Sequence, residues 1–475
     1  MPVPSVILLP QGPWWPMLAR PGNPVDAERA QLRWQLGLPA DRPVVLSGHQ
    51  ASWWHAGILA KFFALDALAR RGDAHAGWVV VDQDSNAFSQ VAYPARAGDG
   101  SITRGLWQSA PAKLAADQRA DCALASLPTF TPQPIPTDAA TPDAERGLRA
   151  INDCLRLHTG AASAGAQVGQ ASIALATSLL PAPAVGPTVL FASKLCDTVA
   201  MRSWIGRMQA DPGACVGAYN QAVRKHAVFG VAPLGMDESR KRYELPLWRL
   251  PPGLAGGSGG GSAPMPRQRV YAHTLAGIPP EQLAPRALLM TAFLRAFACD
   301  LFIHGTGGGA TTLGTAGDEA GYDRVAEDWV QGWLGITLVP SVVASATLLL
   351  DLGTPPTASL EDVRQAHRLI HSARHTPALL GNASAQAQKE ALVGQIRASN
   401  DAGERARLYR QMHGLLDGVV AGSAGQMGAI KARAEALSGA YAREGLLRDR
   451  TWPWPLHSRG ALLGLAKAVR EGMGV

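Results

Sequence analysis

The feature that most constrains the fold is a strand, turn, helix and strand pattern near the start of the chain. Residues 42–47 (RPVVLS) are a short β-branched run, typical of a buried strand, that ends at Gly48. Apolar residues from 58 to 68 then recur at helical spacing, and Gly72 ends that helix. A second strand is predicted at 78–81. Two strands joined through a helix form a βαβ unit, so the pattern predicts a parallel sheet.

Later segments repeat this alternation of short strands and helices. Strands are predicted at 188–192, 300–303 and 339–352, and helices at 197–210, 216–227, 285–299 and 322–334. We therefore expect an α/β fold with a Rossmann-like parallel-sheet core. We expect the first part of the core at residues 1–125 and the second part at residues 266–358. Between them, residues 126–265 are expected to form a helical connecting insertion with Pro-rich and Gly/Ser-rich loops. Residues 359–475 are expected to form a C-terminal helical coiled coil.

The C-terminal region is helical from about residue 360 onward. Two faces of this region carry apolar residues three and four apart, a heptad-like seam. They are Leu408, Met412, Leu415 and Val419, and then Met427, Ile430, Ala434, Leu437 and Tyr441. Joined through residues 418–428, the two faces predict an antiparallel coiled-coil arm.

Composition indicates a folded protein of two or three structural units, because 475 residues exceed one ordinary core. The net charge of +7 is spread along the chain without a basic cluster, which does not favour a nucleic-acid partner. No run of 18 apolar residues predicts a membrane span, and residues 1–20 lack the basic start of a signal peptide. The five cysteines include no C-x-x-C pair, so we expect reduced thiols and a cytoplasmic location.

The first candidate site is the turn between the first strand and its helix. It concentrates Gly48, His49, Gln50, Trp54, His55, Gly57 and Lys61. Ligands of open α/β sheets bind at the carboxyl ends of strands, and a helix start offers free N–H groups to an anion. Histidines can move protons and glycine allows close approach of a ligand, although the tryptophans could equally cover the core.

The second candidate is Asp82-Gln83-Asp84-Ser85, directly after the second strand. Asp82 and Asp84 could hold a ribose, an amine or a metal-bound phosphate, or form a solvated turn. The third is the run from His304 through Gly305, Gly307 and Gly308, whose backbone suits an anion.

The remaining sequence patterns give weaker evidence for a functional site. His367, His371 and His375 share one helical face, but no acidic or cysteine partner lies nearby, so we expect no metal site. Residues 253–266 are Gly/Ser-rich without a G-K-[ST] ending, which predicts a flexible loop rather than a phosphate loop. Neither G-x-S-x-G nor H-E-x-x-H occurs.

Three of these segments, in this order, resemble the family of the cysteine-adding enzyme of bacillithiol biosynthesis. That family carries T-G-Q-Q-x-G-L-x-x-G-P-L-Y-T-x-x-K, where this chain has Ser47-Gly48-His49-Gln50, Gly57 and Lys61. Its E-D-H-D segment corresponds to residues 82–85, and its G-G-P-G-E segment to residues 304–309 followed by Tyr322 and Asp323. The chain departs from the family at His49, at D-Q-D-S and by an insertion at 311–321. It resembles more closely those relatives that carry F-I-H-G-x-G-G and Y-D in place of G-G-P-G-E.

The resemblance implies a Rossmann-like nucleotide pocket, a homodimer formed through the coiled-coil arm, and ligase chemistry. The family reaction joins the carboxyl group of cysteine to the amine of a glucosaminyl-malate. We therefore expect a ligase-like enzyme that condenses an amino acid with an amine-bearing small molecule, with a nucleotide such as ATP or ADP as ligand and the need for Mg²⁺ left open.

In this interpretation His49 or His304 is the general base, Asp82 and Asp84 orient the amine or ribose, and Lys61 balances negative charge. Two alternatives stay open. One is nucleotidyl transfer on a related core, and the other is a non-catalytic protein that binds a nucleotide or metabolite.

Overall fold

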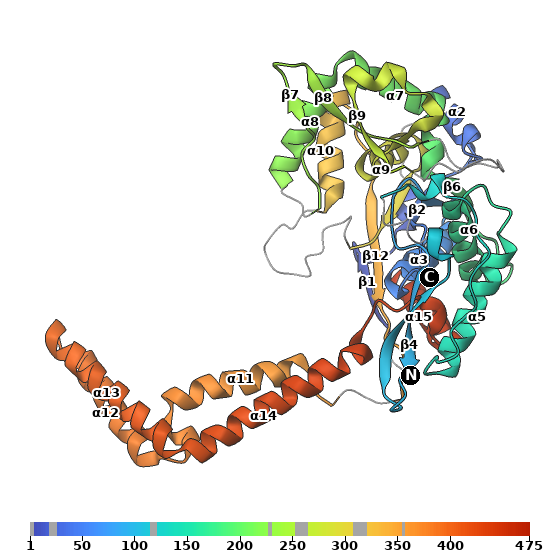
Figure 1. The fold of residues 1–475 in the computed structure, drawn as a ribbon. Coiled ribbons are helices and arrows are strands. Elements are labelled where there is room, and N and C mark those ends of the chain that lie inside the picture. The colour runs from blue at the N-terminus through green and yellow to red at the C-terminus, as the bar shows by residue number, and fades with distance from the viewer. Residues whose placement is uncertain are drawn as a thin grey trace. The chain divides into compact units, whose positions relative to one another are not determined.

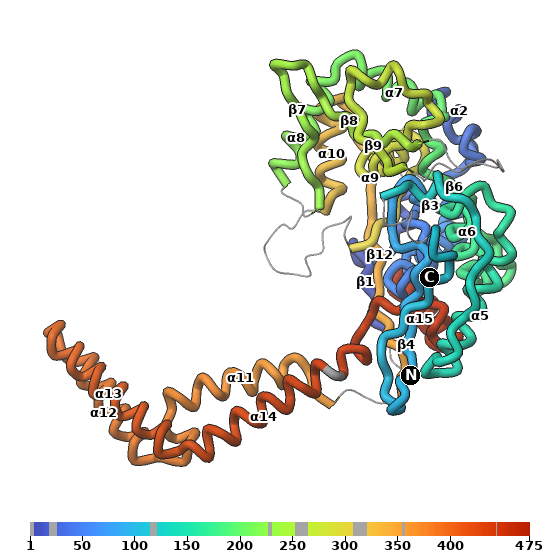
Figure 2. The backbone as a smooth tube through the Cα atoms, in the orientation of Figure 1, coloured from blue at the N-terminus to red at the C-terminus, as the bar shows by residue number. Residues whose placement is uncertain are grey.

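A computed structural model describes residues 4–18, 26–114, 121–226, 230–251, 265–306, 321–353 and 357–475. The chain forms two compact units, shown as a ribbon in Figure 1 and as a backbone tube in Figure 2. The first comprises Met1–Leu350 together with Arg450–Val475, and the second is Asp351–Asp449. Each is described by itself.

A six-stranded sheet forms the centre of the first unit, in the order β1-β12-β11-β2-β3-β6 (Figure 1). Its strands are β1 (Ser5–Leu9), β2 (Val44–Gln50), β3 (His75–Val81), β6 (Thr188–Phe191), β11 (Leu301–His304) and β12 (Ser341–Thr347). All neighbours pair in parallel except β1, which is antiparallel to β12. The predicted mixed α/β fold with a mainly parallel sheet is confirmed.

Helices pack against both faces of the sheet, so its strands are buried on each side. On one face lie α3 (Ala56–Arg71) and α6 (Ala164–Thr177), where Gly169 allows α6 to approach Val80 closely. On the other face Leu46, Val79 and Phe302 join one large apolar cluster. That cluster is completed by residues of α7 (Val199–Ala210), α8 (Pro212–His226), α9 (Ala287–Phe293) and α10 (Tyr322–Leu334).

The remaining elements of the first unit surround this core. They include the helices α1 (Trp15–Leu18), α2 (Ala27–Gln35), α5 (Pro142–Leu157) and α15 (Arg459–Gly472), and the hairpin of β4 (Gln90–Arg96) and β5 (Ile102–Gln108). A small antiparallel sheet contains β7 (Met236–Asp237), β8 (Arg242–Arg249), β9 (Gln268–Tyr271) and β10 (Leu283–Pro285). After α9 the chain continues as one π-helical turn, Leu294–Ala298.

The end of the chain differs from the expected C-terminal segment of 359–475. Residues from Arg450 onward belong to the first unit, where α15 packs against α3 and β1. The reason is the amphipathic pattern of α15, which buries Leu462, Leu465 and Val469 along one face.

The second unit is helical in its described part and consists mainly of α11 (Leu360–His375), α12 (Ala383–Ala398), α13 (Ala402–Gly422) and α14 (Ala424–Arg443). Here α11 packs against α14 and α12 against α13 (Figure 1). Leu408 and Met412 of α13 therefore contact Leu392 and Ile396 of α12.

The predicted antiparallel pairing of the 408–419 face with the 427–441 face along their length is therefore wrong, although Leu415 and Val419 share an apolar cluster with Met427 and Ile430 near the junction. Only Ser423 separates α13 from α14, whereas a chain reversal between two helices needs a loop of about two to five residues.

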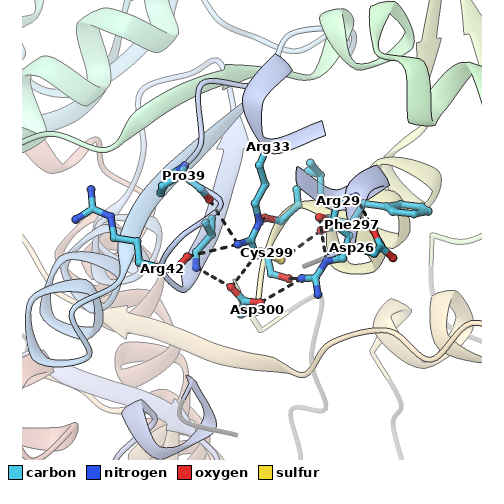
Figure 3. Close-up of polar contacts among 11 residues, drawn as sticks. Asp26, Arg29, Arg33, Pro39, Arg42, Phe297, Cys299 and Asp300 are labelled. Atoms are coloured by element: carbon cyan, nitrogen blue, oxygen red, sulfur yellow. Dashed lines mark hydrogen bonds and ion pairs between the residues drawn. The ribbon is translucent and has the colours of Figure 1, made fainter. Parts of the chain in front are cut away.

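A buried ion-pair cluster joins α2 to the start of β11 (Figure 3). The Asp300 carboxylate accepts hydrogen bonds from Arg33 Nη2 at 2.7 Å, from Arg29 Nη2 at 3.1 Å and from the Val44 backbone N–H at 2.8 Å. The Asp300 N–H in turn donates to the Val44 carbonyl at 2.8 Å. These bonds fix the starts of β2 and β11 side by side.

Replacing Asp300 by asparagine should lower the free energy of unfolding by about 3 kcal/mol. The side chains of Arg33 and Arg29, 1% and 4% exposed, would lose the carboxylate that pairs with both of them. Urea unfolding of the Asp300→Asn variant measures this, with Glu471→Gln as the control. The exposed Lys467–Glu471 pair should contribute under about 1 kcal/mol. Equal losses in the two variants would contradict the structural role of Asp300.

Candidate functional site

A cavity lies where the order of the sheet reverses. From β2 the chain continues to β3 and β6 on one side and later returns to β11 on the other side of β2. The carboxyl ends of β2 and β11 are therefore neighbours at a topological switch point, the usual ligand position in open α/β sheets. The cavity there has a volume of about 270 Å³. It is lined by Gly48, His49, Gln50, Lys61, Val79, Val81, Asp84, Ala287, Met290, Thr291, Phe302, His304 and Tyr322.

Gly48 is required by the packing of β2 against β3. A Cβ atom at this position would lie 2.4 Å from the Val79 carbonyl oxygen, a distance that no side chain tolerates. Gly48 also presents its own carbonyl oxygen to the Lys61 side chain of α3, whose Nζ donates to it at 2.5 Å.

Lys61 is buried on the wall of the cavity, with 4% of the residue exposed. Its Nζ lies 5.6 Å from the centre of the Trp78 ring, and within the described residues no carboxylate forms an ion pair with it. Burial without a compensating anion disfavours the ammonium form and lowers the pKa of Lys61 to about 7. Both protonation states are therefore populated near neutral pH.

The two histidines of the β2–α3 turn have different positions. His49 lines the cavity and is half-buried, and its pKa is well below the ordinary value because of burial, with further repulsion from Lys61 and His55. His55 caps α3 instead, and its Nδ1 accepts a hydrogen bond from the Gly57 N–H at 3.0 Å. Burial, then Arg450 and Lys61, lower the pKa of His55. Gly57 leaves room for the His55 ring, because its Cβ would lie 2.7 Å from Cε1.

Trp54 does not line the cavity. It is 2% exposed and packs in an aromatic cluster, with its ring centre 4.7 Å from that of Trp78 and 6.1 Å from that of Phe62. The structure therefore places Trp54 in the core beneath α3.

The two aspartates after β3 are separated. Asp82 is buried and accepts hydrogen bonds from the Ser193 N–H at 2.8 Å and hydroxyl at 2.6 Å, which anchor the turn after β6. Burial raises the pKa of Asp82, although the two bonds from Ser193 partly oppose this. Asp84 lines the cavity, where it accepts from Gln50 Nε2 at 3.1 Å and pairs with Arg267.

His304 and Tyr322, which also line the cavity, form a buried polar chain with Asp323. Tyr322 Oη lies 3.1 Å from His304 Nδ1, and His304 Nε2 lies 2.9 Å from Asp323 Oδ1. The tyrosine contact favours the tautomer in which Nδ1 accepts from the hydroxyl and Nε2 carries the hydrogen, although the 2.9 Å approach of Nε2 to Asp323 Oδ1 lacks the angle of a hydrogen bond.

Asp323 is held by two further residues. Its Oδ2 accepts from the Ser341 hydroxyl at 2.8 Å, and Arg295 Nη1 lies 3.4 Å from Oδ1. Burial alone would raise the pKa of Asp323, but His304, Arg295 and Ser341 together lower it. Burial, with Asp323 nearby, raises the pKa of Tyr322, so its hydroxyl stays protonated.

The glycine run is described only in part. Gly305 follows β11, and its Cα lies close enough to Lys61 that an added Cβ would be 3.9 Å from Lys61 Cδ. Gly307 and Gly308 lie outside the described residues.

Several residues of the site had no local signal in the sequence. Arg267, Arg295 and Ser341 each contact a site carboxylate from an element far away in the chain. Thr291 and Met290 lie in an ordinary apolar helix pattern. Only the tertiary arrangement reveals them.

Burial raises the thiol pKa of Cys154, Cys196, Cys215 and Cys299, to about 12 at Cys215 and Cys299, so none of these four thiols is activated. No disulfide bond joins these four cysteines.

The three histidines of α11 are exposed, and His367 and His375 lie two turns apart. Across the described parts of the chain, no group of three His, Cys, Asp or Glu side chains is placed to hold a metal ion. In the same residues, every helix is too short or too polar to span a bilayer.

The chain matches no protein-family model, and no curated protein matches it. What the site can do therefore follows from its geometry.

Substitutions at His49 and Asp323 should separate a ligand-facing residue from a supporting one. His49 makes no side-chain hydrogen bond within the described residues, so His49→Ala should change the free energy of unfolding by less than about 1 kcal/mol. Asp323→Asn removes the anion beside buried His304 and Arg295 and should cost about 2–4 kcal/mol. Chemical denaturation measures both, and a larger loss for His49→Ala would assign it a structural role.

Proposed function

We propose that this protein is an enzyme that condenses a small amino acid with an amine-bearing small molecule to form an amide, and that the cavity at the ends of β2 and β11 is its active site. The proposal rests on one observation, which is that a cationic group and a proton-transfer chain line the same cavity. Lys61 supplies a positive charge, and the Tyr322–His304–Asp323 chain supplies proton transfer.

Amide formation needs both groups. As the amine nitrogen attacks the acyl carbon, negative charge develops on the acyl oxygen and the nitrogen must lose a proton. In the proposed reaction the Lys61 ammonium stabilises the oxygen. The amine passes its proton to the Tyr322 oxygen while the Tyr322 hydroxyl proton moves to His304 Nδ1, and Asp323 stabilises the imidazolium that forms.

His304 suits the role of base better than His49. Asp323 lies 2.9 Å from His304 as an anionic neighbour, whereas burial, then Lys61 and His55, lower the pKa of His49. We therefore assign His49, with Gln50 and Asp84, to substrate orientation.

A free carboxylate must be activated before it reacts with an amine. We propose a nucleoside triphosphate as the activator, so that the N–C bond forms as the C–O bond to the phosphate-bearing group breaks. The volume of about 270 Å³ lies just below the roughly 300–1,000 Å³ of pockets for drug-sized ligands. It suits the reacting ends of the substrates rather than a whole nucleotide.

Two further parts of the proposal rest on the resemblance to the cysteine-adding family. The first unit is a Rossmann-like nucleotide-binding core, which the strand order and the switch point support. The helical second unit is a coiled-coil arm through which a cytoplasmic homodimer forms.

The test is a product assay with a matched variant. Purified protein is incubated with ATP, Mg²⁺, each amino acid in turn and a glucosaminyl-malate acceptor, and mass spectrometry detects an adduct equal to the sum of the two substrates minus water. Tyr322→Phe removes only the hydroxyl of the proton relay. It should lower the rate by about 10²–10⁴-fold with little change in melting temperature.

Thermal shift separates the possible failures. A ligand at a hundred times its Kd stabilises the native protein by about 2.7 kcal/mol, which is visible as a higher melting temperature. A higher melting temperature with ATP or an amino acid, without any product, would reject catalysis. The protein would then be one that binds these ligands without joining them. Absence of any shift and any product would overturn the proposal as a whole.

A further inference from the structure

Lys61 has a second possible reactivity that amide formation does not use. We propose that Lys61 is a covalent capture site for small aldehydes or ketones, which it binds as a Schiff base inside the cavity. This inference goes beyond the proposed ligase reaction and needs neither ATP nor a second substrate.

The position of the side chain carries the inference. Lys61 is buried yet lines the cavity, and the described hydrogen bonds of its Nζ go to one neutral acceptor, the Gly48 carbonyl oxygen. A lysine in a water-poor pocket without a carboxylate partner is readily deprotonated, and the neutral amine is a nucleophile. By contrast, Lys225 and Lys467 pair with carboxylates on the surface.

The cavity also suits the compound to be captured. Val79, Val81, Met290 and Phe302 give it apolar walls, which favour an uncharged carbonyl compound with a short aliphatic chain. Among the described residues that line the cavity, Asp84 is the one carboxylate, and it is paired with Arg267 and bonded to Gln50.

The proposed step balances without an added reactant. The Lys61 nitrogen attacks the carbonyl carbon, and the C=O π bond becomes a hydroxyl group with the proton from the attacking amine. That hydroxyl takes the Tyr322 hydroxyl proton and leaves as water, the remaining N–H proton returns to the Tyr322 oxygen, and a neutral C=N bond remains with no net gain or loss of protons.

Reductive trapping tests the proposal. The full-length protein is treated at pH 7 with isobutyraldehyde and sodium cyanoborohydride, and peptide mass spectrometry measures the alkylation rate of every lysine. Lys61 should react at least about tenfold faster than the exposed Lys194. An unperturbed lysine of pKa about 10.4 is almost entirely protonated at this pH, whereas Lys61 is not.

The pH dependence has a definite sign. Alkylation of Lys61 should rise as the pH increases through about 7, because the reactive form is the neutral amine. Other charged or titratable groups lie around Lys61, and their charges would shift the pH midpoint of Lys61 alkylation. They are His49, His304, Tyr322 and Asp84, and His55 lies behind the cavity at the start of α3, near enough to Lys61 for their charges to interact.

Two variants control the experiment. Lys61→Met should abolish the fast reaction and melt no lower than the wild type, because it removes a buried, uncompensated ammonium. Lys194→Met, on the surface, should leave the fast reaction unchanged. Alkylation at Lys61 no faster than at Lys194, or a fast reaction that persists in Lys61→Met, would overturn the inference, whatever the product assay for the ligase shows.

Discussion

The candidate site depends on the alignment of two neighbouring strands, and the Asp300 carboxylate sets that alignment. Asp300 binds the backbone of Val44 at the start of β2 and two buried arginines of α2, so β2 and β11 begin at the same level. The ladder then pairs Leu301 with Val45 and Ile303 with Ser47, and the Ser47 hydroxyl donates to the Ile303 carbonyl at 2.8 Å. Because parallel strands rise almost equally per residue, Gly48 and His304 reach the same edge of the sheet.

The same burial that stabilises the core creates the chemistry at this edge. Trp78, Phe62 and Trp54 exclude water beneath α3, and Lys61 emerges from this apolar layer into the cavity without a carboxylate partner among the described residues. Desolvation therefore brings the pKa of the lysine to about 7 and moves the pKa of His49 well down. Asp323 lies 2.9 Å from His304, so this imidazole, unlike Lys61, has a carboxylate neighbour among the described residues. Buried groups whose pKa is far from the ordinary value, as at Lys61 and His49, are common at active sites.

Much of this arrangement could be predicted from local sequence. The β-branched run before Gly48, the helical spacing that ends at Gly72 and the strand before Asp82 gave three correct elements, because each carries its own periodicity and end signal. The helix at Tyr322–Leu334 was likewise predicted with its observed bounds.

What could not be predicted depends on partners that are distant in the chain. The edge strand β1 pairs with β12 across more than three hundred residues, and Asp82 meets Ser193 rather than a ligand. Arg295 and Ser341 hold Asp323 from separate elements, and neither stands in a motif. The helical unit shows the same limit, because its apolar faces were predicted but the packing of α13 against α12 and of α14 against α11 was not.

The most direct test of the account is the titration of Lys61 itself. The chain has eight lysines, few enough for their side chains to be followed by carbon-13 NMR after labelling at the ε-carbon. The account predicts one signal that titrates near pH 7 and is absent from the Lys61→Met variant. If every lysine signal instead titrates near the unperturbed value of about 10.4, Lys61 is solvated or paired, and the site described here would be contradicted.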